Sequence, residues 1–222
     1  QPDKKIVTIE DPVEYQISGI NQIHVNSQIG LTFAAGLRSI VRQDPDVIMV
    51  GEMRDLETVE IGIRAALTGH LVFSTLHTND APGAIARMVD MGAEDYLLAS
   101  TILGVLAQRL VRIICPECKE RQSVEDSFLE EIGIPPDDRT EVFEGKGCKE
   151  CGQTGYQGRI GIFELMLMDE EVRRLILANS DATQLRKAAI QGGMISLRAD
   201  GLEKVKQGIT TISEVLRVTQ DL

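Results

Sequence analysis

The chain has 222 residues, of which 43% are hydrophobic and 26% are charged, a balance typical of a folded globular protein. Its net charge of −11 argues against a nucleic-acid backbone as the partner of the whole surface, whereas small phosphorylated ligands remain open. The longest charge-free apolar segment, residues 96–107, is far shorter than the roughly 20 residues that cross a bilayer, and no signal peptide precedes the first strand-like segment. We therefore expect a cytosolic protein.

Three short apolar runs in the first half of the chain are typical of strands. They lie at residues 6–9, 47–50 and 71–76. Continuous apolar runs of this length suit strands that are buried on both faces of a parallel sheet. The first run begins almost at the start of the sequence, which suggests that the first ordered element of a larger domain lies outside it.

Helical patterns separate these strands. One helix is predicted at residues 32–42, and another begins after a cap at Asp55 and stops at Gly69. A third is predicted from about residue 80 and a fourth over residues 96–113. This alternation predicts an α/β sheet with right-handed crossovers.

The composition of the sequence changes after residue 114. Residues 115–158 contain all four cysteines and many glycines and prolines, so we expect little regular structure there and read the segment as a metal-held insertion. Helical patterns return from residue 169 and predict a small helical subdomain. Its predicted helices are residues 171–177, 182–191, 197–207 and 213–219.

The four cysteines are spaced as two C-x-x-C pairs separated by 29 residues: Cys115, Cys118, Cys148 and Cys151. Four thiolates at this spacing predict a tetrahedral Zn²⁺ site that is structural, because no coordination position is left open for catalysis. Two disulfides are the competing interpretation, which a reducing compartment disfavours. We expect chelation to loosen residues 115–158 and to leave the α/β sheet folded.

Polar residues follow each of the three predicted strands. The first strand runs into EDPVE at residues 10–14, the second into GEMRD at 51–55, and the third into HTND at 77–80. In an open parallel sheet, ligands bind outside the carboxyl ends of the strands. If the strands are neighbours, two carboxylate clusters and an imidazole meet at one edge, an arrangement that can hold Mg²⁺ beside a nucleoside triphosphate. The alternative is that acids follow strands because turns are polar, and three successive cases weaken it.

Four motifs together resemble those of the secretion ATPase superfamily. TIEDPVEY resembles its Asp box, DVIMVGEMRD its Walker B segment, TGHLVFSTLHTND its His box, and CPEC with CKEC its tetracysteine motif. Within the superfamily the chain is most similar to the type II secretion ATPases (GspE class), with the assembly motors of type IV pili (PilB class) as close relatives.

The resemblance implies a fold and a domain organisation. The expected fold is an α/β, RecA-like P-loop NTPase core, truncated at its N-terminal side, with a zinc-binding tetracysteine insertion and a small C-terminal helical subdomain. The expected domains are residues 1–114, 115–158 and 159–222. No G-x-x-x-x-G-K-[ST] phosphate loop occurs in the sequence, so we expect this chain to hydrolyse ATP negligibly by itself.

The resemblance also implies roles for individual residues. Glu14 is expected to orient or deprotonate the attacking water, Glu52 to hold Mg²⁺, and His77 to sense the γ-phosphate. Glu10 and Asp11 either assist the metal or cap a turn. These roles suit phosphoryl transfer, which depends mainly on positioning and charge neutralisation.

For His70 a structural role is an alternative to a place in the site, and several arginines are expected to act at subunit contacts. A strand of seven residues at about 3.3 Å each would place His70 roughly 23 Å from His77, so the two cannot share a metal and His70 is as readily structural, although the family's His box includes both. Guanidinium groups that contact neighbouring subunits and phosphate are implied at five positions: Arg38, Arg42, Arg54, Arg87 and Arg159.

The expected function is the carboxy-terminal part of a hexameric ATPase motor that uses ATP, Mg²⁺ and Zn²⁺ to drive protein export by the type II secretion system. Such a motor is cytoplasmic and peripheral to the inner membrane, where it meets membrane platform proteins, and it does not bind nucleic acid. A type IV pilus assembly ATPase and a non-catalytic, zinc-stabilised interaction module are the alternatives. A stand-alone metallohydrolase would require His70 and His77 to meet, which a strand between them forbids.

Overall fold

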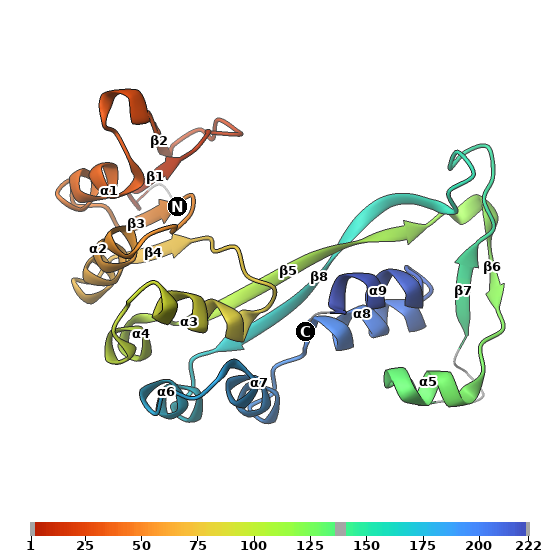
Figure 1. Cartoon of the computed structure of the whole chain (residues 1–222). Coiled ribbons are helices and arrows are strands. Elements are labelled where there is room, and N and C mark those ends of the chain that lie inside the picture. Colours follow the sequence, from red (N-terminus) through yellow and green to blue (C-terminus); the bar gives the residue numbers. More distant parts are fainter. Residues whose placement is uncertain (1–2, 136–140, 221–222) are drawn as a thin grey trace. The chain divides into compact units, whose positions relative to one another are not determined.

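The computed structural model describes residues 3–135 and 141–220 (Figure 1). The chain forms two compact units. The first contains the described residues up to Thr78, together with Pro82–Leu103 and Met168–Leu185. The second contains Asn79–Ala81, the described part of Gly104–Leu167, and the described residues from Arg186 onward. The three-part division expected from the sequence stays a prediction.

A four-stranded parallel sheet forms the centre of the first unit (Figure 1). Its strands lie in the order β2-β1-β3-β4, and every neighbouring pair is parallel. Their bounds are β1 Ile6–Glu10, β2 Asn21–His24, β3 Val47–Val50 and β4 Leu71–Ser74. The predicted strands β1, β3 and β4 are therefore direct neighbours, which confirms the parallel α/β sheet, while β2 was not predicted.

Two helices cover one face of this sheet. They are α1 Phe33–Val41 and α2 Leu56–Leu67, and each is capped by the side chain that precedes it, Thr32 and Asp55 respectively. Both predicted helices are confirmed. The core beneath them is formed by Val7, Ile9, Leu37, Ile40, Ile48, Val50 and Ala65.

Strand β4 departs from the prediction that all three strands are buried on both faces. Leu71 and Phe73 are 40% and 55% exposed. Both side chains lie on the sheet face opposite α1 and α2, because they pair in register with Val47 and Met49 rather than with the buried Ile48 and Val50. A fully apolar run therefore does not by itself report burial on both faces.

The remaining helices of the first unit connect the sheet to the rest of the chain. They are α3 Ala81–Asp90, α4 Asp95–Thr101, α6 Glu170–Leu177 and the first part of α7 Ala182–Gln191. Arg173 of α6 donates to the carbonyl oxygen of Ala99 in α4 and, over 3.0 Å, to that of Met168. A short 3-10 helix at Ser27–Ile29 completes this unit.

The predicted helix over residues 96–113 is wrong beyond Thr101. Residues from Gly104 onward form strand β5 Gly104–Ile114, which pairs antiparallel with β8 Tyr156–Leu167 (Figure 1). Apolar residues occupy both faces of β5, with Leu106 and Leu110 on its exposed face and Val111 on its buried face, so the alternation of apolar and polar residues typical of a strand is obscured in the sequence. The pairing with distant β8 overrides the local helical preference of this segment.

Residues 115–158 contain more regular structure than predicted. After a 3-10 turn at Pro116–Cys118, β6 Lys119–Gln122 pairs antiparallel with β7 Val142–Gly145, and helix α5 covers Asp126–Ile132. The C-terminal helices α8 Leu197–Lys206 and α9 Ile212–Thr219 confirm the helical patterns predicted there. One core joins these elements through Leu129, Ile132, Ile134, Val142, Leu202, Val205, Ile212 and Val215.

Helices of the described residues are all too short or too polar to span a lipid bilayer.

Candidate functional site

The carboxyl ends of β1, β3 and β4 meet at one edge of the parallel sheet. Backbone hydrogen bonds fix this edge: the N–H of Gly51 donates to the carbonyl of Ile9 over 2.7 Å, and the N–H of Met53 donates to that of Thr75 over 3.1 Å. The hydroxyl of Thr75 also donates to the carbonyl of Gly51 over 2.6 Å. The loop that carries Glu52 is thus bonded to both neighbouring strands, as the sequence predicted for a shared edge.

Glu52 lies at the centre of this edge. One carboxylate oxygen accepts a hydrogen bond from the guanidinium of Arg54, and the other lies 3.2 Å from Nε2 of His77. The side chain of Glu52 is 13% exposed, whereas that of His77 is 87% exposed. The hydrogen bond from Arg54 holds the pKa of Glu52 below its usual value, although burial opposes the shift. Glu52 is therefore a bonded, ionised carboxylate with an exposed imidazole beside it.

The two acids that end β1 have different surroundings. Glu10 accepts hydrogen bonds from the hydroxyl of Thr8 over 2.5 Å and from the amide of Gln22 over 3.0 Å, so it is tied to its own strand and to β2. The pKa of Arg54 is raised mainly by Glu52, with a smaller contribution from the charge of Asp11. The charge of Asp11 thus influences the group that contains Glu52, whereas Glu10 forms its hydrogen bonds within the sheet.

Glu14 is exposed on the loop after β1. Within residues 3–135 and 141–220, no hydrogen bond or ion pair joins it to Glu52 or His77. The structure therefore brings together the acid and the histidine predicted at β3 and β4, and within the described residues it shows no hydrogen bond or ion pair from the acid predicted at β1 to either of them.

His70 lies at the opposite end of β4 from His77. Its Nδ1 lies 2.9 Å from the carbonyl oxygen of Ala65 and 3.0 Å from the hydroxyl of Thr68, so it bonds to the last turn of α2. This geometry matches the structural alternative for His70, and it keeps the two histidines apart.

The predicted arginines are scattered over both units. Arg54 contacts Glu52, whereas Arg38 forms an ion pair with Glu57 that joins α1 to α2. Arg42 is the C-cap of α1 and Arg87 lies in the last turn of α3, both exposed. Arg159 lies on β8, in the second unit, opposite Arg112. In the described structure Arg54 is thus the one member of this set that contacts Glu52.

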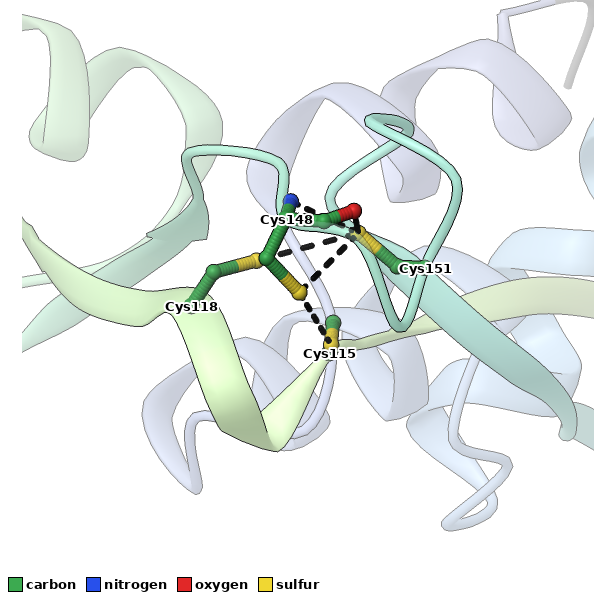
Figure 2. A group of neighbouring side chains, drawn as sticks. All are labelled: Cys115, Cys118, Cys148 and Cys151. Atoms are coloured by element: carbon green, nitrogen blue, oxygen red, sulfur yellow. Dashed lines mark hydrogen bonds between the residues drawn. The ribbon is translucent and has the colours of Figure 1, made fainter.

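The four cysteines converge in the second unit (Figure 2). Their sulfur atoms all lie within 4.8 Å of one another, and the cluster could hold a metal ion. The Sγ–Sγ distances are 3.8 Å for Cys115 and Cys148, 3.9 Å for Cys118 and Cys151, and 3.7 Å for Cys148 and Cys151. All four cysteines are free thiols rather than disulfides.

Backbone amides surround these sulfurs. The N–H of Gly147 donates to Sγ of Cys118 over 3.3 Å, and the N–H groups of Cys148 and Gly155 donate to Sγ of Cys151 over 3.2 Å each. The N–H of Cys148 lowers the pKa of Cys151 to about 6, whereas burial raises the pKa of Cys118 to about 12. Donors aimed at sulfur favour thiolates, which are the form that binds metals.

Sequence reasoning missed two residues that shape the sheet edge. Thr75 fixes Gly51, and Gln22 fixes Glu10. Thr75 directly precedes the predicted strand end and could have been proposed as a hydrogen-bond donor there. Gln22 could not, because the strand that carries it was not predicted.

Comparisons with known proteins agree with this architecture. A family model described as "Type II/IV secretion system protein" matches residues 1–217. The chain is 52% identical over 218 residues to type II secretion system protein E of Pseudomonas aeruginosa, a match that covers 98% of this chain and 43% of that protein. It is 51% identical over 220 residues to the type IV pilus assembly ATPase PilB of Thermus thermophilus, covering 98% of this chain and 25% of that protein.

Among solved structures, the pilus retraction motor PilT with bound ADP matches with a TM-score of 0.71 and 32% sequence identity. This match covers 98% of the present chain and 53% of the PilT chain. For comparison, the chain spans less than half the length of the Pseudomonas aeruginosa type II secretion system protein E described above.

Proposed function

Because the chain belongs to the type II/IV secretion system protein family, we propose that it is part of an ATPase motor that couples ATP hydrolysis to protein export by a type II secretion system. The family assignment confirms the resemblance read from the four sequence motifs. The single observation that carries the proposal is the Glu52, Arg54 and His77 group at the carboxyl edge of the parallel sheet. Ligands of open α/β sheets bind at this edge.

Each member of the group has a proposed role. Glu52 is ionised and largely buried, so it would hold Mg²⁺ beside a bound nucleoside triphosphate, and the metal would supply neutralisation of the charge that develops during phosphoryl transfer. His77 is exposed and would reach the γ-phosphate. Glu14 would orient or deprotonate the attacking water, and its exposed loop leaves it free to approach a bound nucleotide.

The arginines would serve contacts between subunits. Arg42, Arg87 and Arg159 are exposed, which suits a guanidinium that meets phosphate or a neighbouring subunit. The motor is proposed to be a hexameric ring that lies on the cytoplasmic side of the inner membrane and meets platform proteins there. The RecA-like core and the C-terminal helical subdomain belong to the same proposal.

The cysteine cluster is proposed to bind one structural Zn²⁺. Four sulfurs at about 2.3 Å from a tetrahedral zinc lie about 3.8 Å from one another. The observed distances of 3.7, 3.8 and 3.9 Å fit this geometry. Plasma emission analysis of the reduced protein should find one zinc per chain, and a metal-free reduced protein would rule the site out.

The type IV pilus assembly ATPases remain the second candidate. The identity to the Thermus protein, 51%, is close to the 52% of the type II protein, so similarity alone does not separate the two functions. Deletion of the gene in the source organism decides between them. Loss of secreted enzymes with intact pili supports secretion, and loss of pili with intact secretion supports pilus assembly.

The test of catalysis uses the full-length gene product. Glu52→Gln should abolish ATP turnover and Glu14→Gln should lower it by about a hundredfold or more, because each removes a group that acts in the transition state. Glu60→Gln is the matched control, since Glu60 forms an exposed ion pair with Arg64 on α2. Normal turnover in both site variants would show that this sheet edge is not the catalytic site, and absence of turnover in the wild-type full-length protein would favour the non-catalytic interaction module.

The 222-residue chain by itself is proposed to turn over ATP negligibly, because its sequence contains no phosphate loop. Robust turnover by this chain, retained after further purification and lost in Glu52→Gln, would show that the site works without such a loop and would overturn this part of the proposal.

A further inference from the structure

The peptide groups on both sides of Glu52 are bonded to one residue of the neighbouring chain segment, Thr75. The hydroxyl of Thr75 donates to the carbonyl oxygen of Gly51 over 2.6 Å, and the carbonyl oxygen of Thr75 accepts the N–H of Met53 over 3.1 Å. Gly51 directly precedes Glu52 in the sequence, and Met53 directly follows it. Thr75 therefore holds the backbone of the proposed metal ligand from both sides.

The hydroxyl bond is an addition to the pairing of β3 with β4. The register of these two strands ends at the pair Val50 and Ser74. Ladders of paired strands use backbone N–H and C=O groups. One residue beyond the ladder, the carbonyl oxygen of Gly51 accepts a side-chain hydroxyl instead. Thr75 thus continues the contact between the two strands into the loop that carries Glu52.

Strand β1 fixes the opposite side of Gly51. The N–H of Gly51 donates to the carbonyl oxygen of Ile9 over 2.7 Å. A Cβ atom at Gly51 would lie 3.2 Å from that oxygen and 3.3 Å from the Cα atom of Glu10, closer than ordinary van der Waals contact. Glycine suits such a close approach of two backbones. The backbone before Glu52 therefore lies between β1 and Thr75, and the hydroxyl supplies the bond on the Thr75 side.

We propose that Thr75 is a positioning residue for Glu52, because its hydroxyl and its carbonyl hold the two peptide groups from which the Glu52 side chain extends. The carboxylate contacts Arg54 with one oxygen and His77 with the other, so a rotation of its backbone would disturb both contacts. Removal of a group that orients a metal ligand typically costs about tenfold to a hundredfold in metal affinity or activity. The proposal rests on the proposed function, in which Glu52 holds Mg²⁺.

Two substitutions separate the hydroxyl from the rest of the Thr75 side chain. Thr75→Val replaces the hydroxyl by a methyl group and keeps the backbone carbonyl, whereas Thr75→Ser keeps a hydroxyl. Thr75 is exposed and follows the last residue of β4, so both variants leave the core intact. Thr101→Val is the matched control, because the hydroxyl of Thr101 also donates to a backbone carbonyl over 2.6 Å, within α4.

The first test measures the contact between Glu52 and His77 in the 222-residue protein, with no nucleotide or Mg²⁺ added. The sequence contains three histidines, so their nuclear magnetic resonance signals can be assigned with single His→Ala variants. Nuclear Overhauser signals between the γ protons of Glu52 and the ring protons of His77 should be present in the wild type, Thr75→Ser and Thr101→Val. We expect Thr75→Val to weaken or abolish them.

The carbonyl carbon of Gly51 reports the hydroxyl bond itself. Its resonance should move in Thr75→Val and stay near its wild-type position in Thr75→Ser. An equally strong Glu52–His77 signal in the wild type and Thr75→Val would overturn the proposal. Equal weakening in Thr101→Val or in Thr75→Ser would also overturn it, because the hydroxyl of Thr75 would then not be the cause.

The second test measures turnover in the full-length protein at a range of Mg²⁺ concentrations. Thr75→Val should raise the Mg²⁺ concentration that gives half-maximal turnover by about tenfold, because a poorly oriented carboxylate holds the metal less tightly. Thr75→Ser and Thr101→Val should keep the wild-type Mg²⁺ dependence. An unchanged Mg²⁺ dependence in Thr75→Val, or a shift of the same size in Thr101→Val, would contradict positioning.

The two proposals fail differently. Normal turnover in Glu52→Gln would overturn the proposed function and leave the resonance results standing. An inactive Glu52→Gln, together with a wild-type Mg²⁺ dependence and an unchanged Glu52–His77 signal in Thr75→Val, would overturn the positioning role alone.

Discussion

Nε2 of His77 lies 3.2 Å from Oε2 of Glu52, and this contact joins the loops that follow β4 and β3. Twenty-four residues lie between the two side chains in the sequence, and the parallel pairing of β3 with β4 is what brings them together. Glu52 is the fixed partner, because Arg54 bonds its other oxygen and its side chain is largely buried. A ligand at this edge would therefore meet a fixed negative charge beside an exposed imidazole.

Arg54→Ala should raise the pKa of Glu52 toward its usual value of 4.5, because the hydrogen bond from Arg54 is the main cause that lowers it. The effect is limited because Arg54 is 63% exposed, and water screens its charge. A pH titration of the Glu52 carboxyl carbon by nuclear magnetic resonance, assigned with Glu52→Gln, measures the change. Arg64→Ala, which removes an exposed cation of α2, is the control that should leave Glu52 unaffected. An unchanged pKa in Arg54→Ala would mean that the guanidinium does not hold the carboxylate in solution.

Much of the first unit could be predicted from the sequence because its signals are local. Thr32 and Asp55 are caps that bond the helix directly after them, so α1 and α2 were placed to within a residue or two. The meeting of Glu52 and His77 followed from one rule about parallel strands. In contrast, β5 needs β8 as its partner, and Ala107 and Glu164, for example, pair across more than fifty residues, which no local pattern reports.

The same limit explains why buried contacts of the second unit could not be predicted. Glu164 bonds Ala81 and Leu197, and Arg186 bonds Asp80, so each of these contacts joins segments that lie far apart in the sequence. A glutamate inside an apolar strand signals a buried acid, but it does not reveal which N–H groups bond it. Glu14 is the converse case: a motif assigns it a role, and its contacts in the structure do not test that role.

Ile162→Ala should destabilise the second unit by about 2 to 5 kcal/mol, because the side chain is fully buried and its loss leaves a cavity. Leu165→Ala on the same strand should cost about 0.5 kcal/mol or less, because Leu165 lies on the exposed face and is 50% exposed. Urea denaturation followed by circular dichroism measures both. Equal costs would contradict the alternation of buried and exposed residues along β8, the strand that pairs with β5.

Glu214 should make the second unit sensitive to acid. Burial raises its pKa, but hydrogen bonds from Arg217 and Arg112 outweigh burial and lower it from 4.5 to about 2. Because the folded-state pKa is the lower one, this contribution to stability is complete above about pH 4.5 and is lost as the pH falls toward 2. The shift corresponds to a contribution on the order of 3 kcal/mol.

Glu214→Gln should therefore lower the free energy of unfolding at pH 7 and flatten its dependence on pH between 4.5 and 2. Glu171→Gln is the matched control, since the pKa of Glu171 is also lowered, by Arg174, but both side chains are exposed. We expect that control to change stability little. Denaturant unfolding at several pH values measures the effect, and parallel pH profiles for wild type and Glu214→Gln would show that this carboxylate does not control acid stability.

Removal of metal from the cysteine cluster should destabilise not only the loops that carry the cysteines but also other elements of the second unit. Leu129 of α5 and Val142 of β7 share a core with Leu202 of α8 and Val215 of α9. Elements next to the cluster therefore pack against the C-terminal helices. A segment whose fold is stabilised by a bound metal loses that stabilisation when the metal is removed. Chelation of the reduced protein should speed amide hydrogen exchange in β6, β7, α8 and α9.

The parallel sheet of the first unit has a separate core, formed by residues such as Ile9, Leu37 and Val50. Its amides should therefore keep their protection after chelation, and added Zn²⁺ should restore protection in the second unit. Cys151→Ser should reproduce the effect of the chelator, because three thiolates bind zinc less tightly than four. Slow exchange of β7 and α9 after complete metal removal would show that the hydrophobic core alone holds these elements, and faster exchange in β1 and β3 would show that the two cores are coupled.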